Sequence, residues 1–117
     1  MLAKANRITS ADDYRVIVRK GAKVARAHTV SYVRSRESGT EPRFGFIVSK
    51  KVGTAVQRNL VRRRLKAICL EAIVDGGVRG VDVVVRALPG SADAEWPALR
   101  SEVLGALDRQ LKGAVHA

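Results

Sequence analysis

The stretch PRFGFIVSKKVGTAVQRNLVRRRLKAICL, from Pro42 to Leu70, decides the fold of this chain and concentrates its charge. It holds eight Lys or Arg residues and no Asp or Glu. The whole chain has 22 basic and 11 acidic residues, a net charge of +11, so the remainder contributes only +3 (14 basic minus 11 acidic). Such a local excess is typical of a surface that meets a polyanion.

The pattern within this stretch predicts a strand followed by a long helix. Apolar side chains alternate along residues 44–48, as expected for a strand with Phe44, Phe46 and Val48 on one face. After Gly53 a helix is expected over residues 55–74, with one apolar stripe packed on a sheet. The stripe consists of Val61, Leu65, Ile68 and Ala72.

A second side of the same helix carries only cationic and amide groups. Its members are Arg58, Asn59, Arg62, Arg63 and Lys66. Burial of several unpaired charges would be prohibitively costly, and a solvated helix face usually mixes both signs of charge. Guanidinium groups instead make bidentate bonds to phosphates. With Lys50 and Lys51, which end the preceding strand, these residues form a predicted phosphate-binding surface, called here the basic surface.

The elements on either side complete an α+β pattern. Ser10 and Asp13 indicate the start of a helix over residues 11–20, which ends at Gly21. Residues 23–36 look extended, with Val30, Tyr32 and Arg34 on one side. We expect them to form an antiparallel hairpin with residues 44–48, across a turn at residues 37–42. Gly76, Gly77 and Gly80 end the long helix. Residues 81–87 predict a central strand and residues 95–112 a last helix, with the stripe Leu99, Val103, Leu107 and Leu111.

Length and composition favour one domain over residues 1–117, with an ordinary apolar fraction of 46%. The single cysteine, Cys69, excludes an internal disulfide and is expected to be a buried helix residue. Neither a spanning apolar run nor a signal peptide is evident, so we expect a cytoplasmic protein without a membrane partner. The basic helix and few aromatic residues suit folded RNA, although composition alone leaves DNA open.

Residues 44–66, FGFIVSKKVGTAVQRNLVRRRLK, resemble the signature of the bacterial ribonuclease P protein component. That family pairs a strand ending in S-K-K-x-G with A-V-x-R-N-R and a basic helix. The elements Asn6-Arg7-Ile8, Lys20-Gly21 and Arg86 before Pro89 are also similar in order and spacing, so the resemblance covers about residues 4–112. One position departs from the motif: Leu60 stands where the family has its second arginine, and Arg64 is a candidate replacement for the lost charge.

The resemblance implies a fold and a set of contacts. The expected fold is a small sheet of about four strands with three helices in the order αβββαβα, a ribosomal-protein-like family fold whose left-handed βαβ crossover breaks the usual handedness rule. Arg7 and the basic surface would bind the catalytic RNA near its metal ions. Tyr14, Val18, Tyr32 and Arg86 would line a cleft for the 5′ leader of precursor tRNA. The family often has an aromatic residue where this chain has Val18, so leader affinity is expected to be weaker.

The same resemblance implies that RNA performs the chemistry. The expected function is that of the protein subunit of ribonuclease P. No protein catalytic residues are expected, because His28 and His116 are too few and too far apart in the sequence to argue for an acid–base pair. Mg²⁺ would be required by the holoenzyme and held mainly by RNA. The expected partners are the catalytic RNA and precursor tRNA, with no obligate protein partner. The alternative is a structural RNA-binding protein of ribosome or ribonucleoprotein assembly; a DNA-binding regulator is a distant third.

Overall fold

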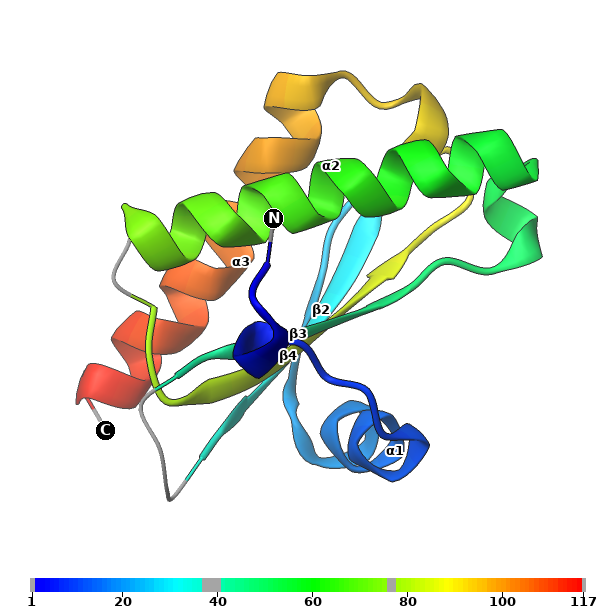
Figure 1. The fold of residues 1–117 in the computed structure, drawn as a ribbon. Helices are drawn as coiled ribbons and strands as arrows, with labels where there is room; N and C mark the ends of the chain where they lie inside the picture. The colour runs from blue at the N-terminus through cyan, green and yellow to red at the C-terminus, as the bar shows by residue number, and fades with distance from the viewer. Residues whose placement is uncertain (1, 37–40, 76–77, 117) are drawn as a thin grey trace.

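A four-stranded sheet with helices on both faces forms the body of the protein (Figure 1). The computed structural model describes residues 2–36, 41–75 and 78–116, with side chains described through Arg109. Its elements are α1 (Ala11–Lys20), β1 (Ala22–Ala25), β2 (Thr29–Ser35), β3 (Arg43–Ile47), α2 (Ala55–Val74), β4 (Val81–Ala87) and α3 (Trp96–His116), with short 3-10 turns η1 (Lys4–Asn6), η2 (Lys50–Val52) and η3 (Ser91–Asp93). Within the described residues, none of the helices is long and apolar enough to cross a membrane.

The sheet order, β1-β2-β4-β3, differs from the hairpin that the sequence predicts. Residues 22–35 form two strands, as the predicted order αβββαβα requires, and β2 pairs antiparallel with both β1 and β4. The predicted hairpin between β2 and β3 is therefore wrong. The reason is that β4 is buried on both faces, with Val83, Val84 and Val85 fully inaccessible, so it takes the central position that separates β2 from β3.

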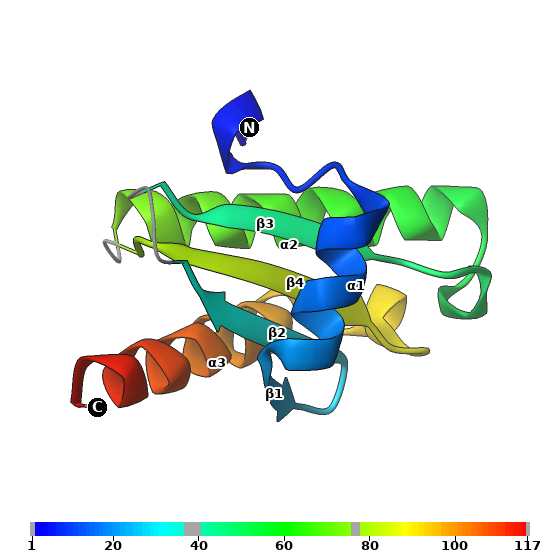
Figure 2. The same ribbon diagram turned by 90° about the horizontal axis from the view of Figure 1, so that it is seen from below.

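The connection from β3 through α2 to β4 is the βαβ crossover that the resemblance implies. β3 and β4 are adjacent and parallel. In Figure 2 both strands run from left to right, β4 lies below β3, and α2 passes behind them, which makes the crossover left-handed. The usual crossover is right-handed. The predicted α+β fold with three helices is thus confirmed, including its exceptional feature.

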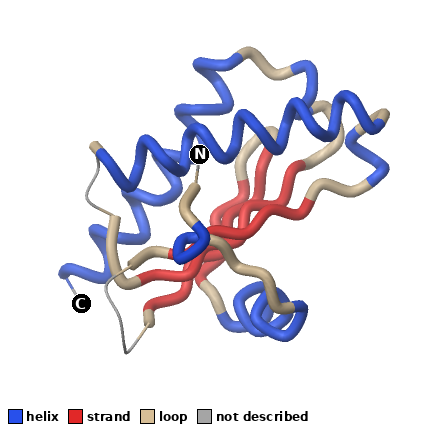
Figure 3. The backbone as a smooth tube through the Cα atoms, viewed as in Figure 1, coloured by secondary structure: helices blue, strands red, loops and turns tan. Residues whose placement is uncertain are grey.

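The two faces of the sheet carry two separate cores. α2 and α3 cover one face and α1 covers the other, as the tube in Figure 3 shows. The larger core lies under α2 and α3, and its side chains include Phe44, Val61, Leu65, Ile68, Val83, Leu99 and Val103. The smaller core lies under α1 and consists of Ile8, Ile17, Val30, Tyr32 and Val84. The predicted alternation of β2 is confirmed, because Val30 and Tyr32 face one core and Val33 faces the other.

Side-chain caps fix where the helices begin. The Ser10 Oγ accepts a hydrogen bond from the backbone N–H of Asp13 at 3.4 Å. At the start of α2, Thr54 and Gln57 form a reciprocal capping box with bonds of 3.2 and 2.8 Å. The predicted bounds of α1 and α2 are confirmed. Some predictions concern residues that lie outside the described part of the chain, namely Gly76, Gly77, residues 37–40 and the side chain of Leu111.

Candidate nucleic-acid interface

The basic surface lies on the outer side of α2 and on η2, which leads into it. The stripe of α2 that faces the sheet is buried as predicted, with Val61, Leu65 and Ile68 at 0% exposure. That packing leaves the adjoining side of the helix toward solvent. Asn59, Arg63 and Lys66 are exposed and line a shallow depression with Arg62 and Val56. Lys50 and Lys51, also exposed, lie on the 3-10 turn before the helix.

Within the described part of the chain, the charges of the basic surface have no acidic partners. Among the described residues, none of its lysines or arginines forms an ion pair with a carboxylate. Arg62 is held by neutral groups instead: its guanidinium donates to the Asn59 Oδ1 at 3.0 Å and to the Val48 carbonyl at 3.4 Å. The Arg58 Nε is buried and has no hydrogen-bond acceptor in the described part of the chain. The surface therefore presents oriented donors and uncompensated positive charge.

Two arginines of the basic stretch are used inside the fold. Arg64 donates to the Ala94 carbonyl at 3.0 Å and so ties α2 to the end of η3. Its candidacy as a replacement for the charge missing at Leu60 stays a prediction. Arg43 makes a bidentate pair with Asp82, through bonds of 2.8 and 2.7 Å. These hydrogen bonds raise the pKa of Arg43, and the pair joins β3 to β4.

A shallow groove of about 490 Å³ lies between α1 and β3. Its floor is apolar, because Tyr14, Val18 and Ile47 line it, and Arg15 and Arg19 stand at its rim. Sequence reasoning identified Tyr14 and Val18 but missed the two arginines. The helical spacing could have found them, since Arg15 and Arg19 lie four residues apart and beside Tyr14 and Val18 on the helix.

Tyr14 is seated directly on the edge strand β3. Its hydroxyl accepts a hydrogen bond from the backbone N–H of Phe46 at 3.2 Å. Its ring lies over Gly45, where an added Cβ would approach the ring atoms to 2.6 Å. Glycine at position 45 thus permits the close approach of the tyrosine, and the half-buried ring keeps part of its surface toward the groove.

The structure does not bring all four predicted cleft residues to this groove. Tyr32 is only 5% exposed and belongs to the smaller core beneath α1. It is buried because β2 is an interior strand whose face is covered by α1. The expectation that Tyr32 lines an open cleft with Tyr14 is therefore wrong. Arg86 is exposed and is the register partner of Ile47, and Arg7 is exposed beside the edge of β3.

The polar contacts of His28 hold two parts of the fold together. Its backbone N–H donates to the Glu102 Oε1 at 2.8 Å, and its Nδ1 lies 2.5 Å from the Glu102 Oε2. The pair ties the start of β2 to α3. Among the residues that the structure describes, no group of three or more His, Cys, Asp or Glu side chains could hold a metal ion.

Comparisons with known proteins identify the family. The family model for Ribonuclease P matches residues 2–111. The ribonuclease P protein component of Clavibacter michiganensis subsp. michiganensis is 43% identical over 112 residues, which cover 96% of this chain and 98% of that one. The protein component of Rhodococcus opacus is 40% identical over 115 residues, which cover 93% and 91%.

Solved structures agree with this assignment. The structure of the Staphylococcus aureus RNase P protein superposes with a TM-score of 0.79 at 27% identity, covering 92% of this chain and 96% of that chain. The RNase P protein from Thermotoga maritima, at 24% identity and a TM-score of 0.73, shows the same fold. The left-handed crossover, the basic surface on α2 and a family match over almost the whole sequence lead to one conclusion: this chain belongs to the ribonuclease P protein component family.

Proposed function

We propose that this chain, as the protein subunit of ribonuclease P, holds the catalytic RNA on its basic surface and the 5′ leader of precursor tRNA in the groove beside α1. The observation that supports this most strongly is the complete lack of acidic partners for the basic surface among the described residues. A protein that kept this surface in water alone would carry repulsion between neighbouring cations without a compensating gain.

Bound phosphates would neutralise these cations and relieve their mutual repulsion. Each phosphate that a lysine or arginine neutralises releases condensed counterions, so binding is expected to weaken steeply as the salt concentration rises. Arg62 is already oriented by Asn59 and by the Val48 carbonyl, so little side-chain entropy remains to be lost on binding.

The groove beside α1 suits an extended single strand. Its apolar floor offers the exposed part of the Tyr14 ring together with the aliphatic side chains of Val18 and Ile47. Bases stack on such a surface without strong sequence preference, and the backbone phosphates can reach Arg15 and Arg19 at the rim. Valine at position 18 supplies contact area but no stacking face, so the proposal predicts moderate leader affinity.

The chemistry is proposed to lie with RNA. Mg²⁺ prefers carboxylate, carbonyl and phosphate oxygens as ligands. The basic surface offers cations and a single amide side chain, Asn59, so its residues do not fit a metal site. The ions that the holoenzyme requires are therefore proposed to be held by RNA phosphates. We place the complex in the cytoplasm without a membrane or obligate protein partner, in keeping with the family and the strongly basic surface.

Reconstitution tests the proposal. The protein is added to the cognate catalytic RNA at an Mg²⁺ concentration that barely supports cleavage by RNA alone, and cleavage of a precursor tRNA with a leader is followed. We expect a large increase in the cleavage rate, because charge neutralisation stabilises the folded RNA. Cleavage that is unchanged by saturating protein would contradict the proposal.

The second candidate, a structural RNA-binding protein, is favoured only by the basic surface itself. It predicts the same steep salt dependence but no sensitivity to the leader. Binding of precursor and mature tRNA to the complex of protein and catalytic RNA separates the two functions, since a purely structural protein would leave both affinities equal.

A further inference from the structure

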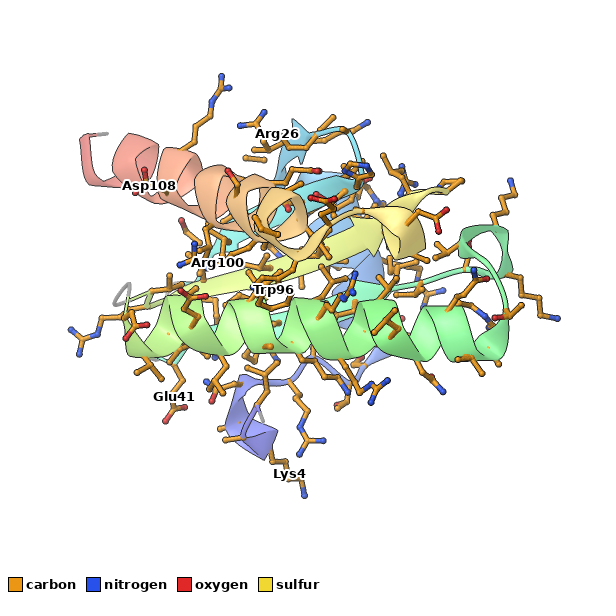
Figure 4. All side chains as sticks on the ribbon, turned by 90° about the horizontal axis from the view of Figure 1, so that it is seen from above. Lys4, Arg26, Glu41, Trp96, Arg100 and Asp108 are labelled. Atoms are coloured by element: carbon orange, nitrogen blue, oxygen red, sulfur yellow. The ribbon has the colours of Figure 1, made fainter. Side chains whose placement is uncertain are left out.

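A second groove, of about 690 Å³, runs along α2 on the side of the N-terminal segment. Figure 4, which looks down on α2, shows η1 with Lys4 on one side of this helix and α3 with Arg100 on the other. Groove-lining residues of α2 recur at intervals of three or four from position 63 to position 75, so they form one continuous face of the helix. This face is distinct from the buried stripe that holds α2 on the sheet.

The chemistry of the groove changes along its length. At one end stand the cations Arg7, Arg63 and Lys66. The middle is lined by the apolar side chains of Leu2, which is buried, and Leu70, which is half-buried, and by Glu71. Val74, which is 72% exposed, lies next along the helix. At the far end is the exposed carboxylate of Asp75. Val74 therefore extends the apolar wall of the groove toward solvent.

We propose that this groove binds one unpaired nucleotide of the catalytic RNA, with its phosphate at the cationic end and its base on the apolar middle. The inference rests on the proposed function, because Arg63 and Lys66 belong to the basic surface and line both this groove and the shallow depression beside it. The groove is thus continuous with the surface assigned to the catalytic RNA. A base within a duplex is stacked and cannot reach such a floor, whereas an extruded base can.

The order of chemical groups along the groove matches a nucleotide better than an apolar peptide or a second copy of this chain. An apolar peptide or a second copy of this chain would leave the three cations unpaired, and two chains of net charge +11 would repel one another. The far carboxylate adds selectivity, because it accepts a hydrogen bond from an exocyclic amino group. Glu71, also in the groove, is paired with Arg100 through bonds of 2.8 and 3.1 Å. Adenine, cytosine and guanine carry such an amino group, and the proposal names one of them as the bound base.

Crosslinking within the holoenzyme tests the assignment. Val74→Cys introduces a thiol in the groove that can carry a short photoreactive aryl azide, while the native Cys69 is buried and stays unlabelled. Ala25→Cys is the matched control, since Ala25 is exposed on β1, at the opposite edge of the sheet from β3. We expect irradiation to yield an adduct at a single unpaired, amino-bearing nucleotide of the catalytic RNA from position 74 and none there from position 25.

A functional cycle completes the test. Removal of the mapped base, leaving an abasic site, is expected to weaken protein binding about five- to tenfold. The same removal should have less than about a twofold effect with the Val74→Asp protein, because the added carboxylate already displaces the nucleotide. The inference is overturned by the absence of an RNA adduct from position 74, by adducts confined to paired nucleotides or precursor tRNA, or by an abasic effect that persists in full in Val74→Asp. Stimulation of cleavage at low Mg²⁺ by the unmodified protein, measured alongside, reports separately on the proposed function.

Discussion

Replacement of Gly45 by alanine is expected to displace Tyr14 and weaken leader binding while the protein stays folded. Gly45 lies on the edge strand β3 under the ring of Tyr14. An added Cβ would approach the Cε1, Cζ and hydroxyl oxygen of that ring to 2.6 Å, closer than any van der Waals contact allows. Either the ring leaves its seat or β3 shifts, and the ring is the more mobile of the two because Tyr14 is only half-buried.

The loss of stability in Gly45→Ala follows from three contributions, of which two are destabilising and one is stabilising. Overpacking costs about 1–3 kcal/mol, and loss of the hydrogen bond from the Phe46 N–H to the Tyr14 hydroxyl adds about 1 kcal/mol. Alanine recovers about 0.5–1 kcal/mol, because glycine loses more backbone entropy in a strand. We therefore expect Gly45→Ala to lower the free energy of unfolding by about 1–3.5 kcal/mol, which a domain with a typical total of about 5–15 kcal/mol survives.

Urea unfolding measures the free energy of unfolding of four proteins: wild type, Gly45→Ala, Tyr14→Ala and the double variant. In the Tyr14→Ala background the ring is absent, so Gly45→Ala should be neutral or slightly stabilising, and the coupling free energy should be at least about 1 kcal/mol. The affinity of the holoenzyme for precursor tRNA should fall for Gly45→Ala as it does for Tyr14→Ala. An equal loss of stability from Gly45→Ala in both backgrounds would refute the reasoning.

Three further outcomes follow from burial and charge. Burial raises the pKa of the Cys69 thiol, so thiol reagents should label the native protein only as fast as it opens; rapid stoichiometric labelling in native buffer would contradict this. Tyr32→Ala should lower the free energy of unfolding by about 3–5 kcal/mol, because the ring fills the smaller core; a loss below about 1 kcal/mol would argue that the ring lies in an open cleft. Hydrogen bonds from Arg100 lower the pKa of Glu71, so the stability that this ion pair provides is present above the unfolded pKa of about 4.3 and is lost as the pH falls through the lower folded value. The stability difference between wild type and Glu71→Gln should therefore shrink below about pH 4, and a difference that is constant from pH 7 to pH 3 would contradict the ion pair.

Local patterns predicted the helices well. The bounds of α1 and α2 and the buried stripe of α2 follow from caps and from apolar spacing, which are encoded in neighbouring residues. The basic surface followed equally directly, because a helix packed through Val61 and Leu65 must turn its other side to solvent. The family resemblance supplied the left-handed crossover, which the general handedness rule would have excluded.

Long-range pairing was beyond these patterns. The insertion of β4 between β2 and β3 depends on contacts between segments that are distant in the sequence. The same limit explains the error at Tyr32: alternation placed it on the correct face, but only the docking of α1 shows that this face is closed there. The contacts of Arg43 with Asp82 and of Arg64 with the Ala94 carbonyl likewise join segments that are distant in the sequence.

The most direct test of the central claim is the affinity of the reconstituted holoenzyme for precursor tRNA relative to mature tRNA, measured with wild type and with Tyr14→Ala. Tyr14 is the aromatic residue of the groove beside α1, and its loss removes the stacking surface proposed for the leader. A stacked base contributes about 1–3 kcal/mol, so the account predicts that Tyr14→Ala weakens precursor binding about fivefold or more and leaves mature tRNA binding unchanged. Equal losses for both substrates, or no preference of the wild type for precursor, would contradict it.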